Sequence, residues 1–453
     1  MKIVIEGAGE VGSHLAKMLR AESNEVTVID DDPVRLSNLA SYADVETISG
    51  HPSSIQVLKD AGVEKADLFI AVYPFATQEV NIIGALLAKQ LGAAKVIARI
   101  NDEDYLNAEN KLLFKELGIE LMFYPEKSAA DEIAEYLKHS STTETMEFAR
   151  GRLQMAVFKL DEESPILDLT LGEFIKSLTA EDLNRFRIIA ISRNNQTIIP
   201  NLDSGFKFGD LVFTITKREG IPTLYKCFGK TNISIRSAMI FGGSSIAEML
   251  AATLVKDGIK VKIIEKDKNR CFELSERLPE SVNIVSGDGR NSDFLYDEGI
   301  QNFDAFISLT GNDETNVLAC VVAKKFGVPR TVAEVENIEY IRLAEEMGVD
   351  NIINKKLITA GRIFKFTLSG KARFVRYMSG TNAEVIEYTV APGAAITNAP
   401  LKDIDFPKNA IIGGVVRGSD AFIAVGNTVI EAYDRVAIFA LPETIKEIDR
   451  FFK

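Results

Sequence analysis

Residues 2–30 read KIVIEGAGEVGSHLAKMLRAESNEVTVID, and this stretch decides how the chain begins to fold. The apolar run IVI predicts a buried strand. Glycines stand at Gly7, Gly9 and Gly12, where helical periodicity begins, and the next apolar run, VTVI, ends at Asp30. A strand, a glycine-rich turn, a helix and a second strand with a terminal acid are typical of the opening of a Rossmann-type sheet, which binds dinucleotides.

Each glycine of this motif has its own physical reason. Gly7 permits the tight turn after the strand, Gly9 lets the backbone approach a pyrophosphate, and Gly12 lets the helix pack on the strand. The start of the helix offers N–H groups and the positive end of its dipole to the phosphates. The predicted phosphate-binding turn comprises Gly7, Ala8, Gly9, Glu10, Val11 and Gly12. A glycine turn that holds no ligand is the alternative interpretation.

Two charged residues extend the predicted site. Asp30 lies 18 residues after Gly12, where a carboxylate accepts hydrogen bonds from the adenine ribose. Its charge would repel a 2′-phosphate, so we expect NAD(H) rather than NADP(H). Arg99 ends the fifth predicted strand at the same edge of the sheet, and we expect it to reach the phosphates; a solvated surface arginine is the alternative.

The motif occurs twice because the chain repeats itself. KIVIEGAGEVGSHLAKML at Lys2 aligns with SAMIFGGSSIAEMLAATL at Ser237, and VTVID aligns with VKIIE at an offset of 235 residues. The offset is again 235 for Asn81 and Asn316, after two extra residues in the first copy between Ala71 and Asn81. Agreement sustained over so many positions indicates an internal duplication.

The second copy has a degraded motif. Its turn consists of Gly242, Gly243, Ser244, Ser245 and Ile246, followed by Ala247. Ser244 replaces the second glycine and its Cβ would crowd a pyrophosphate, whereas Glu265 can take the part of the ribose-binding acid. Glu334 stands where the first copy has Arg99, which reverses the charge. We expect this copy either to bind ATP or ADP or to bind nothing and serve only as structure.

Both copies alternate short apolar strands with helical segments, which is typical of a parallel sheet covered by helices on both faces. In the first copy the predicted strands are IVIEG, VTVID, VETIS, LFIAV and VIARI. After each copy the pattern changes to short β-runs and turns, and these two regions align at an offset of 224 residues. The predicted fold class is α/β, with two Rossmann-like doubly wound parallel sheets, each followed by a smaller β-rich α+β module. The predicted domains are 1–124 and 233–357 for the two nucleotide-binding units, and 144–228 and 371–453 for the β-rich modules.

The composition argues against several classes of function. The formal net charge is −13 and the pI is about 5.0, so the surface would repel a nucleic acid, and no basic run offsets this. The three cysteines form no CxxC pair, which fits a reducing compartment and predicts no zinc site. No segment approaches the ~20 apolar residues that span a bilayer, and the first residues do not read as a signal peptide. We expect a protein that does not cross a membrane by itself.

An enzyme that used the dinucleotide would need a general acid or base beside the nicotinamide. The only histidines are His14, His51 and His139. We expect His14 to be solvated on the first helix, His51 to lie near the adenosine and His139 to lie in a linker. Neither β-rich module has a triad-like or metal-spaced cluster. The prediction is a protein that is not an enzyme, with no catalytic residue and no metal site; an NAD-dependent oxidoreductase is the alternative.

Further segments resemble the TrkA family, the regulatory subunits of bacterial Trk potassium-uptake systems. They are GAGEVG with VID, Gly50-His51 followed by SIQVL, VNIIGALLAKQLG, VIARI, Tyr124-Pro125-Glu126 and NAIIGGVVRGSDAFIA. The resemblance covers essentially the whole chain and includes the order of two nucleotide-binding RCK (KTN) domains, each followed by an RCK-C module. The IIGGVVRG segment within the duplicated layout makes the resemblance specific.

This resemblance implies a cytoplasmic protein, peripheral on the inner face of the cell membrane, that assembles through its RCK domains into a homotetrameric ring. The ring would dock on a TrkH- or TrkG-like potassium-translocating subunit. Nucleotide binding would change the shape of the ring and thereby the gate. An RCK regulator of another cation transporter or of an efflux system is the alternative.

The resemblance also implies which residues bind nucleotide. In the first copy these are residues 7–11, Asp30, His51, Val72, Tyr73 and Arg99, and in the second copy residues 242–246 and Glu265. Three positions depart from the family's pattern. Tyr73-Pro74-Phe75 stands where a Thr- or Ser-rich turn is usual, and Ser244 stands where a glycine is common. The second copy keeps the usual acid, Asp288, where the first has His51.

Overall fold

The computed structural model describes residues 1–73, 78–138, 144–148, 151–194, 196–230, 234–364, 372–377, 381 and 383–452. Pro74, Phe75 and His139 lie outside these residues. The chain divides into two compact units, Met1–Glu132 with Asn354–Thr367, and Ile133–Ile353 with Leu368–Lys453.

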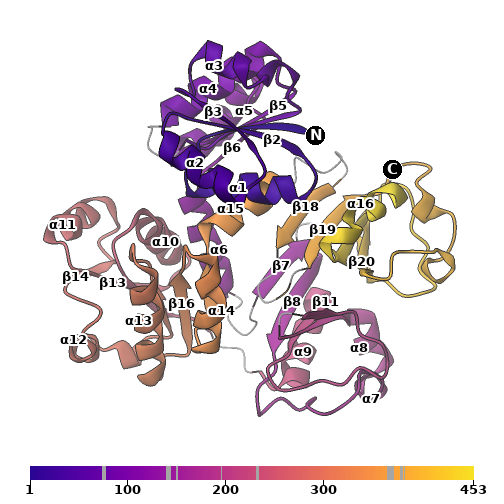
Figure 1. Ribbon diagram of the computed structural model, residues 1–453. Coiled ribbons are helices and arrows are strands. Elements are labelled where there is room, and N and C mark those ends of the chain that lie inside the picture. Colours follow the sequence, from indigo (N-terminus) through magenta and orange to yellow (C-terminus); the bar gives the residue numbers. More distant parts are fainter. Residues whose placement is uncertain are drawn as a thin grey trace. The chain divides into compact units, whose positions relative to one another are not determined.

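The first unit is built on a six-stranded parallel sheet (Figure 1). Its strands are β1 (Lys2–Glu6), β2 (Glu25–Asp30), β3 (Glu46–Ser49), β4 (Leu68–Ala71), β5 (Lys95–Arg99) and β6 (Leu121–Phe123). They lie in the order β3-β2-β1-β4-β5-β6, so the order reverses between β1 and β4. In such sheets the ligand binds at the carboxyl ends of the strands beside this reversal. The predicted doubly wound sheet is confirmed, and β6 comes in addition to the five predicted strands.

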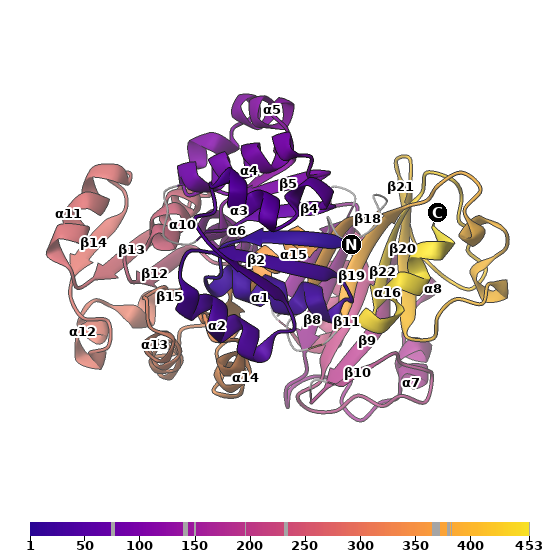
Figure 2. The ribbon, with the colours of Figure 1, turned by 45° about the horizontal axis from the view of Figure 1, so that its top comes forward.

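Helices cover both faces of this sheet. They are α1 (Glu10–Ala21), α2 (Pro33–Tyr42), α3 (Ile55–Asp60), α4 (Gln78–Leu91) and α5 (Ala108–Glu116), with α6 (Pro125–Lys138) after the last strand. Figure 2 shows α1 and α2 on one face and α4 on the other. The strands are apolar along most of their length because both of their faces are covered. A helix from much later in the chain, α15 (Lys355–Phe364), also belongs to this unit and packs against α1.

The second unit contains a parallel sheet of the same order, β14-β13-β12-β15-β16-β17. Its strands are β12 (Ser237–Phe241), β13 (Lys260–Glu265), β14 (Asn283–Ser286), β15 (Ala305–Ser308), β16 (Arg330–Glu334) and β17 (Asn351–Ile353). Its helices are α10 (Ser245–Lys256), α11 (Lys268–Arg277), α12 (Ser292–Asp297), α13 (Asp313–Lys325) and α14 (Ile338–Glu346). The duplication read from the sequence is therefore also a duplication of topology.

The same unit holds two antiparallel β modules, as expected from the alternating short β-runs. The first has β7 (Glu144–Phe148), β8 (Leu153–Lys159), β9 (Phe186–Arg193), β10 (Gln196–Ile198) and β11 (Leu211–Thr216), in the order β10-β9-β11-β8-β7, with α7 (Leu171–Ser177), α8 (Ala180–Arg185) and α9 (Ile221–Phe228). The second has β18 (Ala372–Tyr377), β19 (Glu384–Thr389), β20 (Ala410–Arg417), β21 (Asp420–Ile423) and β22 (Arg435–Ala440), in the order β18-β19-β22-β20-β21, with α16 (Ile445–Ile448). Short 3-10 helices occupy Val63–Lys65, Glu103–Leu106, Arg218–Gly220, Ile300–Asn302, Ala395–Thr397, Leu401–Asp403, Pro442–Thr444 and Asp449–Phe451.

A buried arginine–aspartate pair is repeated in both modules. Arg193 donates from Nε and Nη2 to the carboxylate of Asp210, at 2.8 and 2.7 Å. Arg417 makes the same two contacts with Asp434, at 2.9 and 2.8 Å. Both carboxylates are buried, so each depends on its arginine for charge compensation.

The sheets of the two modules share one apolar core, in which the rings of Phe213 and Phe439 lie 5.3 Å apart. The glycine pair of AIIGGVVRG lies at this contact. A Cβ on Gly413 would lie 2.4 Å from Cγ1 of Ile215, and a Cβ on Gly414 would lie 2.7 Å from Cδ1 of Leu153. Glycine at both positions is therefore what lets the two sheets approach so closely.

Candidate nucleotide-binding site

The turn after β1 requires glycine at two of its positions. Gly7 has a φ of +107°, and a Cβ on it would lie 2.6 Å from Cα of Tyr73. A Cβ on Gly12 would lie 1.9 Å from the carbonyl oxygen of Gly7. The N–H of Gly7 also donates to the carbonyl of Ile29 on the neighbouring strand, at 2.7 Å. The chain thus turns tightly across the carboxyl ends of β1, β2 and β4.

Helix α1 begins directly after this turn with its first amide groups uncapped by a side chain. Its N-cap residue is Gly9, which has no side chain to accept a hydrogen bond, and Glu10 is the first helical residue. The first N–H groups of a helix have no partner within the helix, and together with the helix dipole they form a binding site for an anion. The geometry therefore suits a phosphate at this position.

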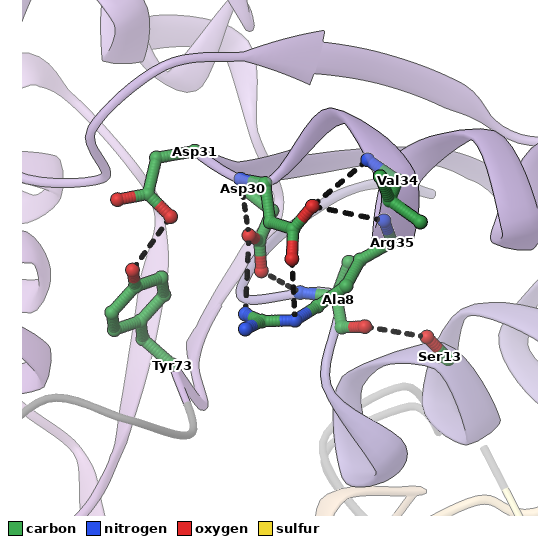
Figure 3. A network of polar contacts seen from close by, with 8 residues as sticks. Ala8, Ser13, Asp30, Asp31, Val34, Arg35 and Tyr73 are labelled. Carbon is green, nitrogen blue, oxygen red and sulfur yellow. Dashed lines mark hydrogen bonds and ion pairs between the residues drawn. The ribbon is translucent and has the colours of Figure 1, made fainter.

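Asp30, at the end of β2, holds the turn in place (Figure 3). Its Oδ2 accepts from the N–H of Ala8 at 2.7 Å, and its Oδ1 accepts from the N–H of Asp32 at 2.8 Å. Nη1 of Arg35 lies 3.4 Å from the same Oδ1. The carboxylate is fully buried, so its visible role is to fix the turn, and its contact with a ribose stays a prediction.

Tyr73, after β4, lies across from the end of β2 at the same edge of the sheet (Figure 3). Its hydroxyl donates to Oδ1 of Asp31 at 2.7 Å. Burial, together with this hydrogen bond, raises the pKa of Tyr73 to about 12. The ring of His51, after β3, lies 6.5 Å from the ring of Tyr73. Val72 is buried and donates its N–H to the carbonyl of Glu6 at 2.8 Å. The structure thus places the adenosine-side residues at one edge of the sheet.

Arg99 has a carboxylate partner. It ends β5, and its Nη2 lies 3.1 Å from Oε1 of Glu126, near the start of α6. Both side chains are about four-fifths covered. A pyrophosphate would have to compete with this neighbour for the guanidinium group, which the sequence alone does not reveal.

Asn81 is a structural residue of the site that the sequence analysis used only to align the repeat. It is buried on α4, where its Oδ1 accepts from the N–H of Tyr73 at 2.8 Å and its Nδ2 donates to the carbonyl of Tyr73 at 3.3 Å. Asn316 makes the same contacts with Thr310 in the second copy, at 2.9 and 3.0 Å. The exact match of the two asparagines across the repeat was the available signal for this role.

The second copy repeats the acid but not the open helix start. The N–H of Gly243 donates to Oε2 of Glu265 at 2.6 Å, which parallels the contact of Ala8 with Asp30. Ser244 is the N-cap of α10, and its Oγ accepts from the N–H of Ala247 at 3.3 Å. Ser245 is the first residue of this helix. The helix therefore satisfies with its own side chain part of what an anion would satisfy in the first copy.

Other positions of the second copy also differ from the first. Asp288, which corresponds to His51, is paired with Arg290, and these hydrogen bonds lower the pKa of Asp288 to about 2. Thr310 replaces the aromatic Tyr73. Ile246 and Glu334 are buried. The second copy thus keeps the backbone frame of the site and changes the side chains around it.

An unexpected acid lies beneath the turn of the first copy. Glu6 is the last residue of β1, is fully buried, and neither carboxylate oxygen has a hydrogen-bond partner among the described residues. Its carboxylate faces Gly84 of α4, where a Cβ would lie 2.0 Å from Oε2. Burial raises the pKa of Glu6 well above its usual range. The equivalent residue of the second copy is Phe241.

The expectation that His14 is solvated is wrong. The side chain is half-buried on α1, and its Nε2 is buried without a hydrogen-bond partner in the described part of the chain. Burial, with Lys356 and Lys17 nearby, lowers the pKa of His14 to about 4. The periodicity of α1 alone does not reveal this, because the covering helix, α15, comes from the other end of the chain.

Two searches of the described residues bear on function. No group of three or more His, Cys, Asp and Glu side chains there is placed to hold a metal ion. No described helix combines the length and the apolar character needed to cross a bilayer.

Family models match most of the chain. The model described as TrkA-N domain matches residues 3–125 and 238–355, and the model described as TrkA-C domain matches residues 155–229 and 385–453. Curated relatives match over the full length. They include the "Trk system potassium uptake protein TrkA homolog" of Archaeoglobus fulgidus, with 35% identity, covering 100% of both chains. The "Trk system potassium uptake protein TrkA" of Halomonas elongata is 32% identical, covering 100% of this chain and 99% of the relative.

Solved structures share the fold at low sequence identity. The "GsuK RCK domain" is 17% identical, with a TM-score of 0.62, and covers 100% of this chain and 94% of that chain. The "GsuK channel bound to NAD" is 18% identical, with a TM-score of 0.61, and covers 100% of this chain and 78% of that chain. The architecture of two parallel-sheet units and two antiparallel modules is therefore that of RCK proteins.

Proposed function

Because this chain belongs to the TrkA family of Trk-system potassium uptake proteins, we propose that it is a regulatory subunit that binds NAD(H) in its first α/β unit and thereby controls a potassium-translocating membrane subunit. The membrane subunit would be TrkH- or TrkG-like. The chain would act in the cytoplasm, at the inner face of the membrane, without catalysing a reaction.

The observation that carries the nucleotide proposal is the start of α1. Gly9 leaves the first amide groups of the helix uncapped, and Asp30 fixes the turn that leads into them. A pyrophosphate would accept from these N–H groups and gain from the dipole of the helix. In support, one protein of the same fold has been solved as a "channel bound to NAD".

The second α/β unit is proposed to bind nucleotide weakly or not at all. Ser244 already accepts a hydrogen bond from the first turn of α10, and the aromatic residue of the first copy is replaced by Thr310. ATP or ADP is the ligand class to test there, because such a site would need only one base and its phosphates.

Assembly of several copies is supported by an exposed apolar surface that repeats with the chain. In the first unit it comprises Ile83, Leu113 and Leu117, which are 48%, 51% and 45% exposed, and in the second unit Leu318, Leu343 and Met347, which are 55%, 53% and 38% exposed. Each set lies on equivalent helices of its unit. Large apolar side chains gathered on one surface mark sites of association. We propose that these surfaces build the ring, with a tetramer as its expected size.

The nucleotide proposal is tested by measuring NADH binding calorimetrically to the wild-type protein and to two matched variants. Asp30→Asn keeps the shape of the side chain but removes its charge and one acceptor, so NADH affinity should fall by about tenfold or more. Glu265→Gln makes the corresponding change in the second copy and should leave NADH affinity unchanged. Equal loss in both variants, or in neither, would contradict the assignment to the first unit.

The partner proposal needs its own experiments. The wild-type protein should co-purify with a TrkH- or TrkG-like subunit and restore potassium uptake in cells that lack their own regulator. Its mass by light scattering should be that of a tetramer, and Leu113→Glu should reduce it. Steady consumption of NADH with a metabolite would instead indicate an oxidoreductase.

A further inference from the structure

Helix α15 carries a lysine to the start of α1. Nζ of Lys356 lies 3.2 Å from Oε2 of Glu10. Glu10 is the first residue of α1 and directly follows the N-cap, Gly9. Both residues belong to the first compact unit, although more than three hundred positions separate them in the chain.

This lysine is held in place by packing more than by its ion pair. The side chain of Lys356 is only 16% exposed, whereas that of Glu10 is 71% exposed. An ion pair with such an exposed partner contributes little to stability. Lys356 also acts on His14, one helical turn further along α1, so its ammonium group lies along the first turn of this helix.

The other cations near the turn have partners that cannot easily leave. Arg99 pairs with Glu126, whose side chain is 19% exposed, and Arg35 lies beside Asp30, whose side chain is fully covered. Glu10 can rotate into solvent without uncovering a core residue. Lys356 is therefore the cation that an arriving anion can recruit at the lowest cost.

We propose that Lys356 is a phosphate-binding residue of the first unit's nucleotide site, supplied by the helix that follows the second α/β unit. This inference rests on the proposed binding of NAD(H) to the first unit. When the pyrophosphate meets the first amide groups of α1, the ammonium group of Lys356 exchanges Glu10 for a phosphate oxygen. A charge-assisted contact of this kind is stronger than an exposed ion pair.

The exchange would also give the nucleotide a mechanical link to the rest of the chain. Helix α15 lies between the second α/β unit and the last β module in the sequence. A ligand shifts a conformational equilibrium only by binding one state better than the other. A phosphate that holds Lys356 favours the state in which α15 is docked on α1.

The test compares Lys356→Gln, Lys356→Arg and Lys17→Gln, with NADH, ADP and adenosine as probes. Lys17 lies on α1 and is exposed, so its variant is a control for the loss of one nearby positive charge. Lys356→Gln should weaken NADH and ADP binding by about tenfold and leave adenosine binding unchanged, because adenosine has no phosphate. Lys356→Arg should retain most of the affinity, and Lys17→Gln should lose less than twofold.

Two further readouts separate phosphate binding from a structural role. The salt dependence of NADH affinity should be weaker in Lys356→Gln than in the wild type, because one screened charge contact is gone. Glu10→Gln should strengthen NADH binding by releasing the lysine and removing a repulsive charge. An equal loss of affinity for adenosine, or unchanged NADH affinity in Lys356→Gln, overturns the inference alone. Wild-type protein that binds neither NADH nor ADP overturns the proposed function and this inference with it.

Discussion

The buried carboxylic acid of Glu6 makes the stability of the first unit depend on pH. Its side chain is fully buried, and its oxygens have no hydrogen-bond partner among the described residues. Burial raises its pKa well above the usual range, so the folded protein keeps a proton that the unfolded chain releases above pH ~4.3. Unfolding then releases a proton, and rising pH favours unfolding.

The magnitude follows from this difference in bound protons. Between the unfolded pKa of ~4.3 and the raised pKa of the folded state, the free energy of unfolding falls by ~1.4 kcal/mol for each pH unit. An unpartnered buried polar group costs a further ~1–3 kcal/mol at any pH. Glu6→Leu removes both costs with an apolar side chain of similar size, as the second copy does with Phe241. We therefore expect Glu6→Leu to stabilise the first unit, with a gain that grows as the pH rises.

The assay is urea denaturation of wild type and variants at pH values from 5 to 8, followed by hydrogen exchange of β1. Glu6→Gln tests the proton alone, since its amide does not titrate, and its advantage over the wild type should also grow with pH. Glu25→Gln is the control, because Glu25 is an exposed carboxylate on the neighbouring strand β2. A constant difference between Glu6→Gln and wild type across this range would refute the reasoning.

Three other substitutions test the packing and the site. Gly84→Ala should destabilise the first unit by ~1–3 kcal/mol, because its Cβ would lie 2.0 Å from Oε2 of Glu6; in a Glu6→Ala background the same change should be neutral or stabilising in urea denaturation. Arg193→Ala leaves its aspartate buried without its countercharge and should cost ~3–5 kcal/mol, measurable as a lower midpoint in urea and poor recovery of folded protein. Gly9→Ser should weaken NADH binding by about tenfold by capping α1 with its own hydroxyl, whereas Ser244→Gly should cost only a few tenths of a kcal/mol and make ADP binding to the second copy measurable by calorimetry.

The doubly wound architecture was predictable from the sequence because its signals are local. The apolar runs, the glycines of the first turn and the terminal Asp30 each lie within about thirty residues of one another. The second copy then supports the first, since the same pattern recurs at a nearly constant offset. The tight contacts of Gly7 and Gly12 follow from the same motif.

Contacts between distant segments could not be predicted in this way. The partner of Arg99 is Glu126, and the partner of Glu10 is Lys356, on a helix from near the other end of the chain. Charge alone offers many possible partners, and only the packing of the helices selects one. His14 was judged exposed for the same reason, because the periodicity of one helix does not show what covers its outer face.

The duplicated chain separates the interactions that build the fold from those that would recognise a ligand. Acids at the end of the second strand, Asp30 and Glu265, both accept from the turn, so this contact is required by the fold whether or not a nucleotide binds. The asparagine that fixes the turn after the fourth strand is likewise present in both copies. What differs is the chemistry at the surface of this common frame, where Gly9 leaves a helix start open and Ser244 closes it. A conserved frame with one open and one closed helix start is the arrangement expected if a single ligand is sensed in one half of the chain and the other half supplies a structural partner.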